Sequence, residues 1–315
     1  MPKFERVRGD LVPEGSWDTH HHVFDLHKYP LADGRHFTPS SATTQELKEF
    51  QERLGFQHTC IAHGLSFGYD LTSLKDYLDY MEGTARGIAV IDHTTISDEE
   101  LQELHDLGVR SVRIDFFRHK AMGSLEKIAD LMRDVANKVA PYKWSIQVQF
   151  SNVGWWDQLA DTVRSLPAQV LVDHNAFLKG SSWAQQPDAD EDTLKQPGLQ
   201  SICSLVKSGH LWIKISAPNR NSRLAPLYPD LKPIVRALLD ANPDRVLYGS
   251  DWPHTQPWEF RTGDDPLKPE PFMEVDDESW IKSFKSWVSE DEWHRIMVDN
   301  PRKLFDYDPK RTGTP

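Results

Sequence analysis

The sequence has few cysteines and fewer basic than acidic residues. Its 315 residues include only two cysteines, Cys60 and Cys203, without the spacing of a metal or redox motif. A disulfide framework is therefore not expected, and a reduced compartment is favoured. Lys and Arg number 36 against 48 Asp and Glu, which gives a formal net charge of -12, and no basic cluster reverses this balance locally. Binding to nucleic acid or to an anionic membrane is not expected.

Long apolar runs are also missing. No stretch approaches the roughly 20 apolar residues that cross a bilayer. The segment from Met1 to Glu14 is polar and charged, without the apolar centre of a secretory signal, so we expect a cytoplasmic protein, either monomer or homodimer. Hydrophobic residues make up 38% and charged residues 27%, which is ordinary for a globular protein with a sizeable core.

Short apolar segments rich in β-branched residues alternate with amphipathic stretches, a pattern typical of βα units on a parallel sheet. The expected strands are residues 17–24, 57–63, 86–91, 109–116, 144–149, 169–173, 211–216 and 245–250. The expected helices are residues 71–82, 97–107, 125–139, 155–165, 229–240 and a helix through Met297 that follows a capping box at Ser289. Eight such strands predict an α/β protein with a (β/α)8 TIM barrel.

No linker divides the chain, so we expect a single barrel domain over residues 1–315, with an N-terminal extension over residues 1–15. Two long loops are expected, over residues 177–198 and 252–279, and each follows the carboxyl end of a strand. Barrel enzymes build their sites at that end, so these loops are either lids and specificity loops or solvated decoration.

Polar residues gather at the ends of the expected strands. His20 and His22 alternate along the first strand and therefore share a face. The other strand ends carry Arg113 and Asp115, Gln147 and Gln149, Asp173 and His174, Lys214 and Ser216, and Asp251 and His254. Three imidazoles and a carboxylate, from His20, His22, His174 and Asp251, are able to hold a divalent metal or to polarise a water.

Single residues of this set leave structural alternatives open. Arg113 and Asp115 could pair with each other, Lys214 could face the outer helices, and His174 alone could be a satisfied structural histidine.

Several motifs resemble the amidohydrolase superfamily, and within it the branch of 2-pyrone-4,6-dicarboxylate lactonases and related lactone hydrolases and decarboxylases. The matching segments include Asp18-Thr19-His20-His21-His22-Val23-Phe24, Val172-Asp173-His174, Gly249-Ser250-Asp251-Trp252-Pro253-His254 and Asn300-Pro301-Arg302-Lys303-Leu304-Phe305. The resemblance covers nearly the whole chain and implies a distorted (β/α)8 barrel.

The resemblance also implies roles for the matching residues. Asp251 would act as general base and then general acid. His20, His22 and His174 would surround the scissile carbonyl, and His254 of the Trp-Pro-His motif joins the candidate catalytic residues. Arg113 and Arg220 would bind substrate carboxylates, a task that suits a guanidinium group.

Some positions depart from the pyrone dicarboxylate enzymes, which carry tyrosine where Phe37 and Gln149 stand, arginine where His119 stands, and arginine near Phe177. Arg118, beside His119, is a candidate substitute for one of these contacts. A less charged lactone, with one carboxylate and an apolar portion, would suit Phe37 and Phe177 better. Phe37, Arg118, His119 and Gln149 are therefore candidate substrate-binding residues.

The residues that are present and missing indicate how many metal ions the site could hold. A two-metal amidohydrolase centre needs a lysine carbamate or glutamate on the fourth strand and usually a histidine on the fifth, and residues 109–116 and 144–149 supply neither. We expect no cofactor, because the resemblance is to a metal-independent branch. The alternative is a single Zn²⁺ held by His20, His22, His174 and Asp251.

We predict a hydrolase that opens a small anionic, carboxylated lactone with water activated by Asp251. A metal-dependent non-oxidative decarboxylase of an aromatic or unsaturated acid is the alternative, and a non-catalytic ligand-binding barrel is a third hypothesis.

Overall fold

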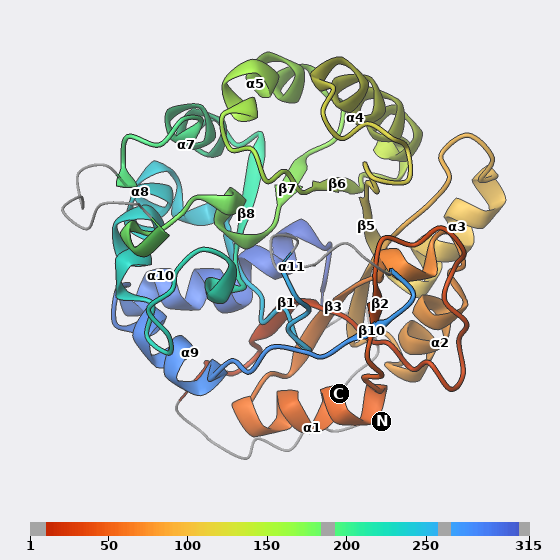
Figure 1. Ribbon diagram of the computed structural model, residues 1–315, viewed down its shortest axis with the longest axis horizontal. Helices are drawn as coiled ribbons and strands as arrows, with labels where there is room; N and C mark the ends of the chain where they lie inside the picture. The colour runs from red at the N-terminus through yellow and green to blue at the C-terminus, as the bar shows by residue number, and fades with distance from the viewer. Residues whose placement is uncertain (1–10, 184–192, 258–265, 309–315) are drawn as a thin grey trace.

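Eight parallel strands form one sheet in chain order in the computed structural model, which describes residues 11–183, 193–257 and 266–308 (Figure 1). The strands are β1 (Trp17–His21), β3 (His58–Ala62), β4 (Ala85–Ala89), β5 (Val109–Arg113), β6 (Ser145–Val148), β7 (Val170–Val172), β8 (Leu211–Ile215) and β9 (Val246–Tyr248). Each strand overlaps one of the eight predicted segments, so the predicted barrel is confirmed.

The two edges of the sheet meet just beyond β9. The amide of Asp251 donates to the His20 carbonyl over 2.7 Å, and the amide of His22 donates to the Trp252 carbonyl over 2.8 Å. The closure is one isolated parallel bridge rather than a regular ladder, and the register also shifts between Gly87 and Ile88. These irregularities make the barrel distorted, and the closure itself brings the end of β1 beside Asp251.

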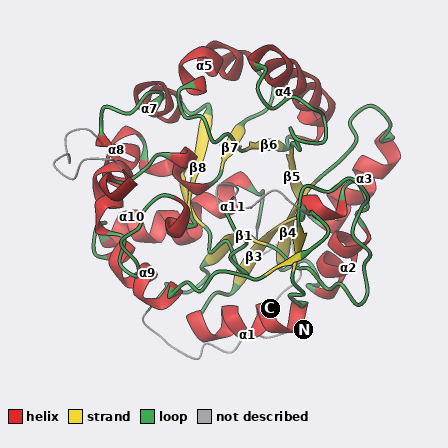
Figure 2. Cartoon of the chain, in the orientation of Figure 1, coloured by secondary structure: helices red, strands yellow, loops and turns green. Residues whose placement is uncertain are grey.

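Most helices surround the sheet on the outside, and α11 (Asn300–Leu304) lies inside this ring in the view of Figure 2. The others are α1 (Thr44–Leu54), α2 (Thr72–Tyr80), α3 (Asp98–Leu107), α4 (Leu125–Val139), α5 (Trp155–Ser165), α7 (Leu199–Lys207), α8 (Lys232–Ala241), α9 (Asp277–Lys285) and α10 (Glu290–His294). The predicted helices over residues 125–139 and 155–165 match α4 and α5. None of the helices in the described part of the chain is long and apolar enough to span a membrane.

The predicted helix after Ser289 begins with its capping box, and a π-helical turn over Arg295–Asp299 separates α10 from α11. Four helices, α1, α7, α9 and α11, were not among those predicted. The start of α1 has a sequence signal, because the side chains of Thr43 and Glu46 cap each other's backbone amides. The start of α9 is capped by Asp276, so the predicted loop over residues 252–279 ends before residue 277.

The long loops are more structured than predicted. The loop after β9 contributes β10 (Pro269–Glu270), which pairs with β2 (Thr38–Pro39) of the loop after β1. The loop after β7 begins with a tight turn over His174–Phe177 and a 3₁₀ turn over Ser181–Trp183. Residues 184–192 and 258–265 of the predicted loops, and residues 1–10 of the predicted extension, lie outside the described residues.

Alternation along the strands decides which side chains enter the barrel. An apolar cluster joins inward side chains of several strands to Phe305, which follows α11; it consists of Cys60, Ala62, Ile88, Leu171, Trp212, Leu247 and Phe305. Asp173 and Lys214 stand two residues after Leu171 and Trp212, so they point to the same side of their strands, closer to the carboxyl ends. The barrel interior is thus apolar at one level and polar at the level of the site.

Candidate active site

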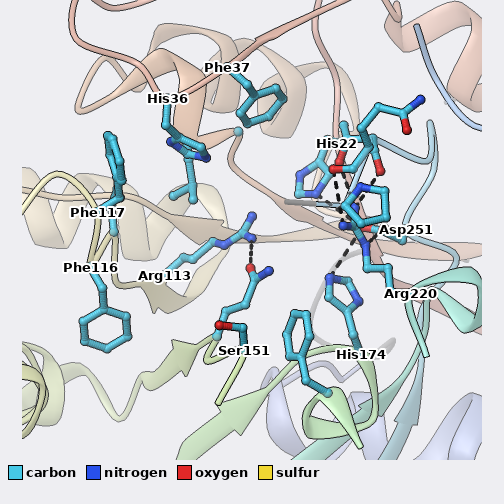
Figure 3. Close-up of a pocket in the computed structure, with 18 of the residues that line it drawn as sticks. His22, His36, Phe37, Arg113, Phe116, Phe117, Ser151, His174, Arg220 and Asp251 are labelled. Carbon is cyan, nitrogen blue, oxygen red and sulfur yellow. Dashed lines mark hydrogen bonds and ion pairs between the residues drawn. The ribbon is translucent and has the colours of Figure 1, made fainter. Parts of the chain in front are cut away.

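A cavity of about 450 Å³ opens at the carboxyl ends of the strands (Figure 3). Its lining comes from the end of β5 and from the loops that follow β1, β3, β5, β6, β7, β8 and β9. The lining residues are His22, Phe24, His36, Phe37, Gly64, Leu65, Arg113, Ile114, Asp115, Phe116, Phe117, Met122, Gln149, Ser151, His174, Phe177, Lys179, Arg220, Asp251, Thr255, Gln256 and Pro257.

Asp251 is the centre of this site. One of its carboxylate oxygens, Oδ1, lies 3.5 Å from His20 Nε2, 3.6 Å from His22 Nε2 and 3.8 Å from His174 Nε2. The other, Oδ2, accepts a hydrogen bond from Arg220 Nε over 3.0 Å. The structure therefore brings together the four residues that the sequence predicted as catalytic or metal-binding. Asp251 Oδ1 has no hydrogen-bond partner among the described residues.

The charges of these groups follow from burial and from Arg220. Burial raises the pKa of Asp251, but Arg220 and the histidines lower it by more and hold it well below its usual range. Burial lowers the pKa of His20 to about 4 and also lowers the pKa values of His22 and His174. Near neutral pH the site therefore presents a carboxylate beside neutral imidazoles.

The Nδ1 atoms of two of these histidines are held by groups behind them. His22 Nδ1 donates to the Ala62 carbonyl over 2.7 Å, and His174 Nδ1 lies 2.9 Å from Ser216 Oγ. His174 begins a run of residues with positive φ that continues through Phe177. This left-handed backbone turns the chain sharply at the end of β7, so that His174 and Phe177 both line the cavity.

Three buried polar side chains lie behind His20 and were not among the predicted catalytic or substrate-binding residues. Lys214 Nζ donates to Gln147 Oε1 over 2.8 Å and lies 3.1 Å from His20 Nδ1. Gln147 Nε2 donates to Asp173 Oδ2 over 2.9 Å, and all four side chains are buried. The alternative in which Lys214 faces the outer helices is wrong, because Lys214 shares the inward face of β8 with Trp212.

Arg113 and Arg220, the two predicted carboxylate-binding arginines, both line the cavity but differ in their partners. Arg113 Nη2 donates to Gln149 Oε1 over 2.6 Å. It does not form the alternative pair with Asp115, whose Oδ2 lies instead 3.7 Å from Arg118 Nε. Arg220 Nε donates a hydrogen bond to Asp251, and Arg220 Nη2 donates hydrogen bonds to the carbonyl and the hydroxyl of Thr255.

The predicted substrate contacts Phe37 and Gln149 line the cavity, whereas Arg118 and His119 are not among its described lining residues. The chain turns after β5, where the amide of His119 donates to the Asp115 carbonyl, and this turn carries both side chains toward Tyr69. His119 Nε2 lies 3.1 Å from the Tyr69 hydroxyl, and Arg118 lies over the Tyr69 ring at 5.3 Å. A role for Arg118 or His119 in contact with substrate is therefore not supported.

His254, also predicted as a catalytic residue, is not among the described lining residues of this cavity. Asp251 and His254 both have positive φ, so the chain reverses immediately after Asp251. The His254 side chain consequently points to α9, where its Nε2 lies 2.9 Å from Asp277 Oδ2. Burial lowers the pKa of His254, but the Asp277 carboxylate raises it by more, and the net shift is upward.

Sequence reasoning missed Lys179, which lines the cavity from the loop after β7. Its Nζ donates to the Arg220 carbonyl over 2.5 Å and lies over the rings of Phe177 and Trp183. A lysine in a long polar loop carries no periodic signal, so the residues around it gave no reason to single it out.

Two groups of described residues have donor atoms within 4.8 Å of one another, close enough to hold one metal ion: His20, His22 and Asp251, and His20, Asp173 and His174. Nitrogen and carboxylate donors at this spacing suit Zn²⁺. His22 fits such a role, because its Nδ1 donates to a carbonyl and its Nε2 keeps a lone pair. His20 Nδ1 lies 3.1 Å from Lys214 Nζ.

Comparison with known proteins agrees with this architecture. The chain is 28% identical to the 4-sulfomuconolactone hydrolase of Hydrogenophaga intermedia, over 94% of this chain and 90% of that protein. It is 28% identical to the 2-pyrone-4,6-dicarboxylate hydrolase of Comamonas testosteroni, over 97% and 98% of the two chains.

Solved structures share the fold. One is an amidohydrolase of Burkholderia multivorans with bound zinc, which is 14% identical, covers 93% of this chain and 99% of its own, and superposes with a TM-score of 0.64. The family model described as "Amidohydrolase" matches residues 17–307, which include every strand of the barrel and the four residues around the Asp251 carboxylate. The chain therefore belongs to the amidohydrolase family.

Proposed function

We propose that this protein hydrolyses a carboxylated lactone and that Asp251 is its general base. The observation that carries the proposal is the Asp251 carboxylate, whose Oδ1 has no hydrogen-bond partner among the described residues and lies within 3.8 Å of three imidazole nitrogens. A buried carboxylate with one oxygen held by Arg220 and the other facing a cavity is placed to accept a proton from water. Relatives named as lactone hydrolases support this reading over nearly the full chain.

In the proposed reaction Asp251 transfers the proton and an imidazole stabilises the developing oxyanion. Asp251 Oδ1 accepts a proton from water while the water oxygen forms a bond to the ring carbonyl carbon. An imidazole N–H next to that carbonyl stabilises the negative charge that develops on its oxygen. The ring C–O bond then breaks, and Asp251 returns its proton to the departing oxygen. The products are a carboxylic acid, which ionises, and a free hydroxyl or enol on the same molecule.

The cavity wall favours a substrate with one carboxylate and an apolar portion. Arg113 lines the cavity and has a side-chain amide as its partner, which leaves its charge for a substrate carboxylate. Arg220 is engaged by Asp251 and Thr255. The phenylalanines of the wall are Phe24, Phe37, Phe116, Phe117 and Phe177. Such a wall binds a hydrocarbon or planar unsaturated group more favourably than a second carboxylate.

Hydrolysis without a resident cofactor is part of the proposal, and a single Zn²⁺ is its alternative. The fold neighbour with bound zinc and the spacing of His20, His22 and Asp251 favour the alternative. The Lys214 ammonium group beside His20 favours the proposal. None of the proposed steps uses an ion.

The test is a panel of carboxylated lactones with one or two carboxylates, assayed by proton release and by the mass gain of one water. The variant Asp251→Asn should lower kcat by about 1000-fold, within the range of general acid–base catalysis, and should still bind substrate. Asp106→Asn, an exposed change on α3, is the matched control and should leave activity unchanged. Undiminished activity of Asp251→Asn would contradict the proposal, and so would release of CO₂ from an acid in place of lactone opening.

A further inference from the structure

His20 has two neighbours at the same nitrogen, and they require opposite protonation states. Its Nδ1 lies 3.1 Å from Lys214 Nζ and 3.2 Å from Asp173 Oδ1. A carboxylate can only accept a hydrogen bond, so a bond to Asp173 would need a proton on Nδ1. An ammonium group can only donate, so a bond from Lys214 needs a lone pair on Nδ1 and places the single imidazole proton on Nε2.

The hydrogen-bond geometry favours Lys214. The contact between Lys214 Nζ and His20 Nδ1 is a hydrogen bond. Asp173 Oδ1 is close to the same nitrogen, but it has no hydrogen-bond partner among the described residues. The carboxylate acts on the imidazole more through its charge than through hydrogen bonding, and the contact with hydrogen-bond geometry at Nδ1 comes from the lysine.

Gln147 fixes the direction of the lysine's bonds. The Asp173 carboxylate accepts from the Gln147 amide nitrogen over 2.9 Å, so the amide oxygen of Gln147 must face Lys214 and accept from it. Lys214 Nζ lies 3.7 Å from Asp173 Oδ1, and both side chains are completely buried. Loss of the lysine's charge would leave a buried carboxylate without a counter-ion, which is costly. Burial lowers the pKa of Lys214 and the Asp173 carboxylate opposes this shift, so we infer that Lys214 is an ammonium donor.

We propose that Lys214 is a positioning residue that holds His20 in the tautomer protonated at Nε2. That N–H faces the space beside Asp251 Oδ1, 3.5 Å away, where His20 Nε2 has no hydrogen-bond partner among the described residues. His22 has the opposite tautomer, because its Nδ1 donates to the Ala62 carbonyl. The two histidines of the motif therefore have different roles. His20 donates a hydrogen bond to a substrate oxygen, and His22 accepts a hydrogen bond from water.

The same tautomer disfavours a metal ion at this centre. A protonated Nε2 has no lone pair for a metal, and an ammonium group on the far side of the ring repels a cation through the buried medium. The centre thus has the spacing of a zinc site without the hydrogen-bond pattern of one. The donor role of His20 rests on the proposed hydrolysis, whereas its tautomer and its effect on zinc affinity do not.

The experiment records ¹H–¹⁵N correlation spectra of the histidine side chains in the full-length protein, with His20 assigned by comparison with His20→Gln. The wild-type protein should show His20 protonated at Nε2. Lys214→Met removes the donor, so His20 should move to the Nδ1-protonated form, with Asp173 as acceptor. Asp106→Asn, an exposed change on α3, is the control and should keep the wild-type tautomer, because Lys214 and Asp173 both remain. Calorimetric titration with ZnCl₂ should show at least a tenfold gain in affinity for Lys214→Met.

A wild-type His20 protonated at Nδ1 would overturn the proposal, and this result needs no variant to fold. An Nε2-protonated His20 in a folded Lys214→Met protein, or an unchanged zinc affinity, would also overturn it. If the tautomer is as proposed but no lactone is hydrolysed, the proposed function fails and the role of Lys214 in setting the tautomer stands.

Discussion

Arg220 Nε donates a hydrogen bond to Asp251 Oδ2 over 3.0 Å, while Asp251 Oδ1 faces the three histidines. The arginine was predicted from the sequence as a ligand of substrate carboxylates. In the structure its guanidinium group instead joins Asp251 to the Thr255 carbonyl and hydroxyl, on the loop that follows β9. Arg220 therefore orients the proposed base and keeps it ionised.

Replacing Arg220 by Met should move the acidic limb of the kcat/KM profile to higher pH. Asp251 must be ionised to accept a proton, and Arg220 is the largest influence that lowers its pKa against the effect of burial. Without the arginine the pKa of Asp251 rises, so activity is lost at a higher pH. Arg223→Met, a change at an exposed arginine, should leave the limb in place. An acidic limb that does not move in Arg220→Met would contradict this role.

Arg113→Met should reduce kcat/KM for an anionic lactone by about 10- to 100-fold, because a hydrogen bond to a charged group contributes about 1.5 to 3 kcal/mol. Most of the effect should appear in KM if the carboxylate is bound equally in the ground and transition states. Arg118→Met is the control, since Arg118 lies against Tyr69 rather than in the cavity. Steady-state kinetics on both variants test this prediction. Equal losses of kcat/KM in the two variants would contradict the assignment of Arg113 as the residue that binds the substrate carboxylate.

Alternation along the strands made much of this site predictable. His20 and His22 share a face of β1, and Asp251 follows the last strand, so closure of the barrel brings them together. Lys214 was ambiguous, because an error of one residue in the position of a strand reverses the faces of its side chains. Alternation from Trp212 within β8 resolves this ambiguity once the strand is placed.

Backbone turns beyond the strands were not predictable from the sequence. The positive φ values at Asp251 and His254 send His254 away from the cavity, although neither residue is the glycine that usually signals such a conformation. The turn after β5 similarly moves Arg118 and His119 out of reach. The pairing of β2 with β10 joins segments more than 200 residues apart, and such short strands carry no periodic pattern.

Asp277→Asn should destabilise the protein more at pH 5.5 than at pH 9. The pKa of His254 is raised above its usual value when the protein folds, because the Asp277 carboxylate outweighs burial. A raised pKa contributes stability that is complete below the unfolded pKa of about 6.5 and is lost as the pH rises through the folded value. The variant should cost about 1 to 3 kcal/mol at the lower pH. Denaturant unfolding of the wild-type protein and the variant between pH 5.5 and 9 measures the difference in the free energy of unfolding. A difference that does not vary with pH would contradict the pairing of His254 with Asp277.

Exhaustive removal of metal should leave lactone hydrolysis intact. The proposed reaction draws its base from Asp251 and its oxyanion donor from the His20 N–H, and neither group needs an ion to act. The enzyme is dialysed against dipicolinate, its zinc content is measured by mass spectrometry, and kcat/KM is compared before and after. Added ZnCl₂ should inhibit hydrolysis. A cation near His22 Nε2 and Asp251 Oδ1 would bind the lone pairs that otherwise accept hydrogen bonds from the water. A loss of activity on chelation that zinc restores would instead make the cluster a catalytic metal site and would favour the metal-dependent alternatives.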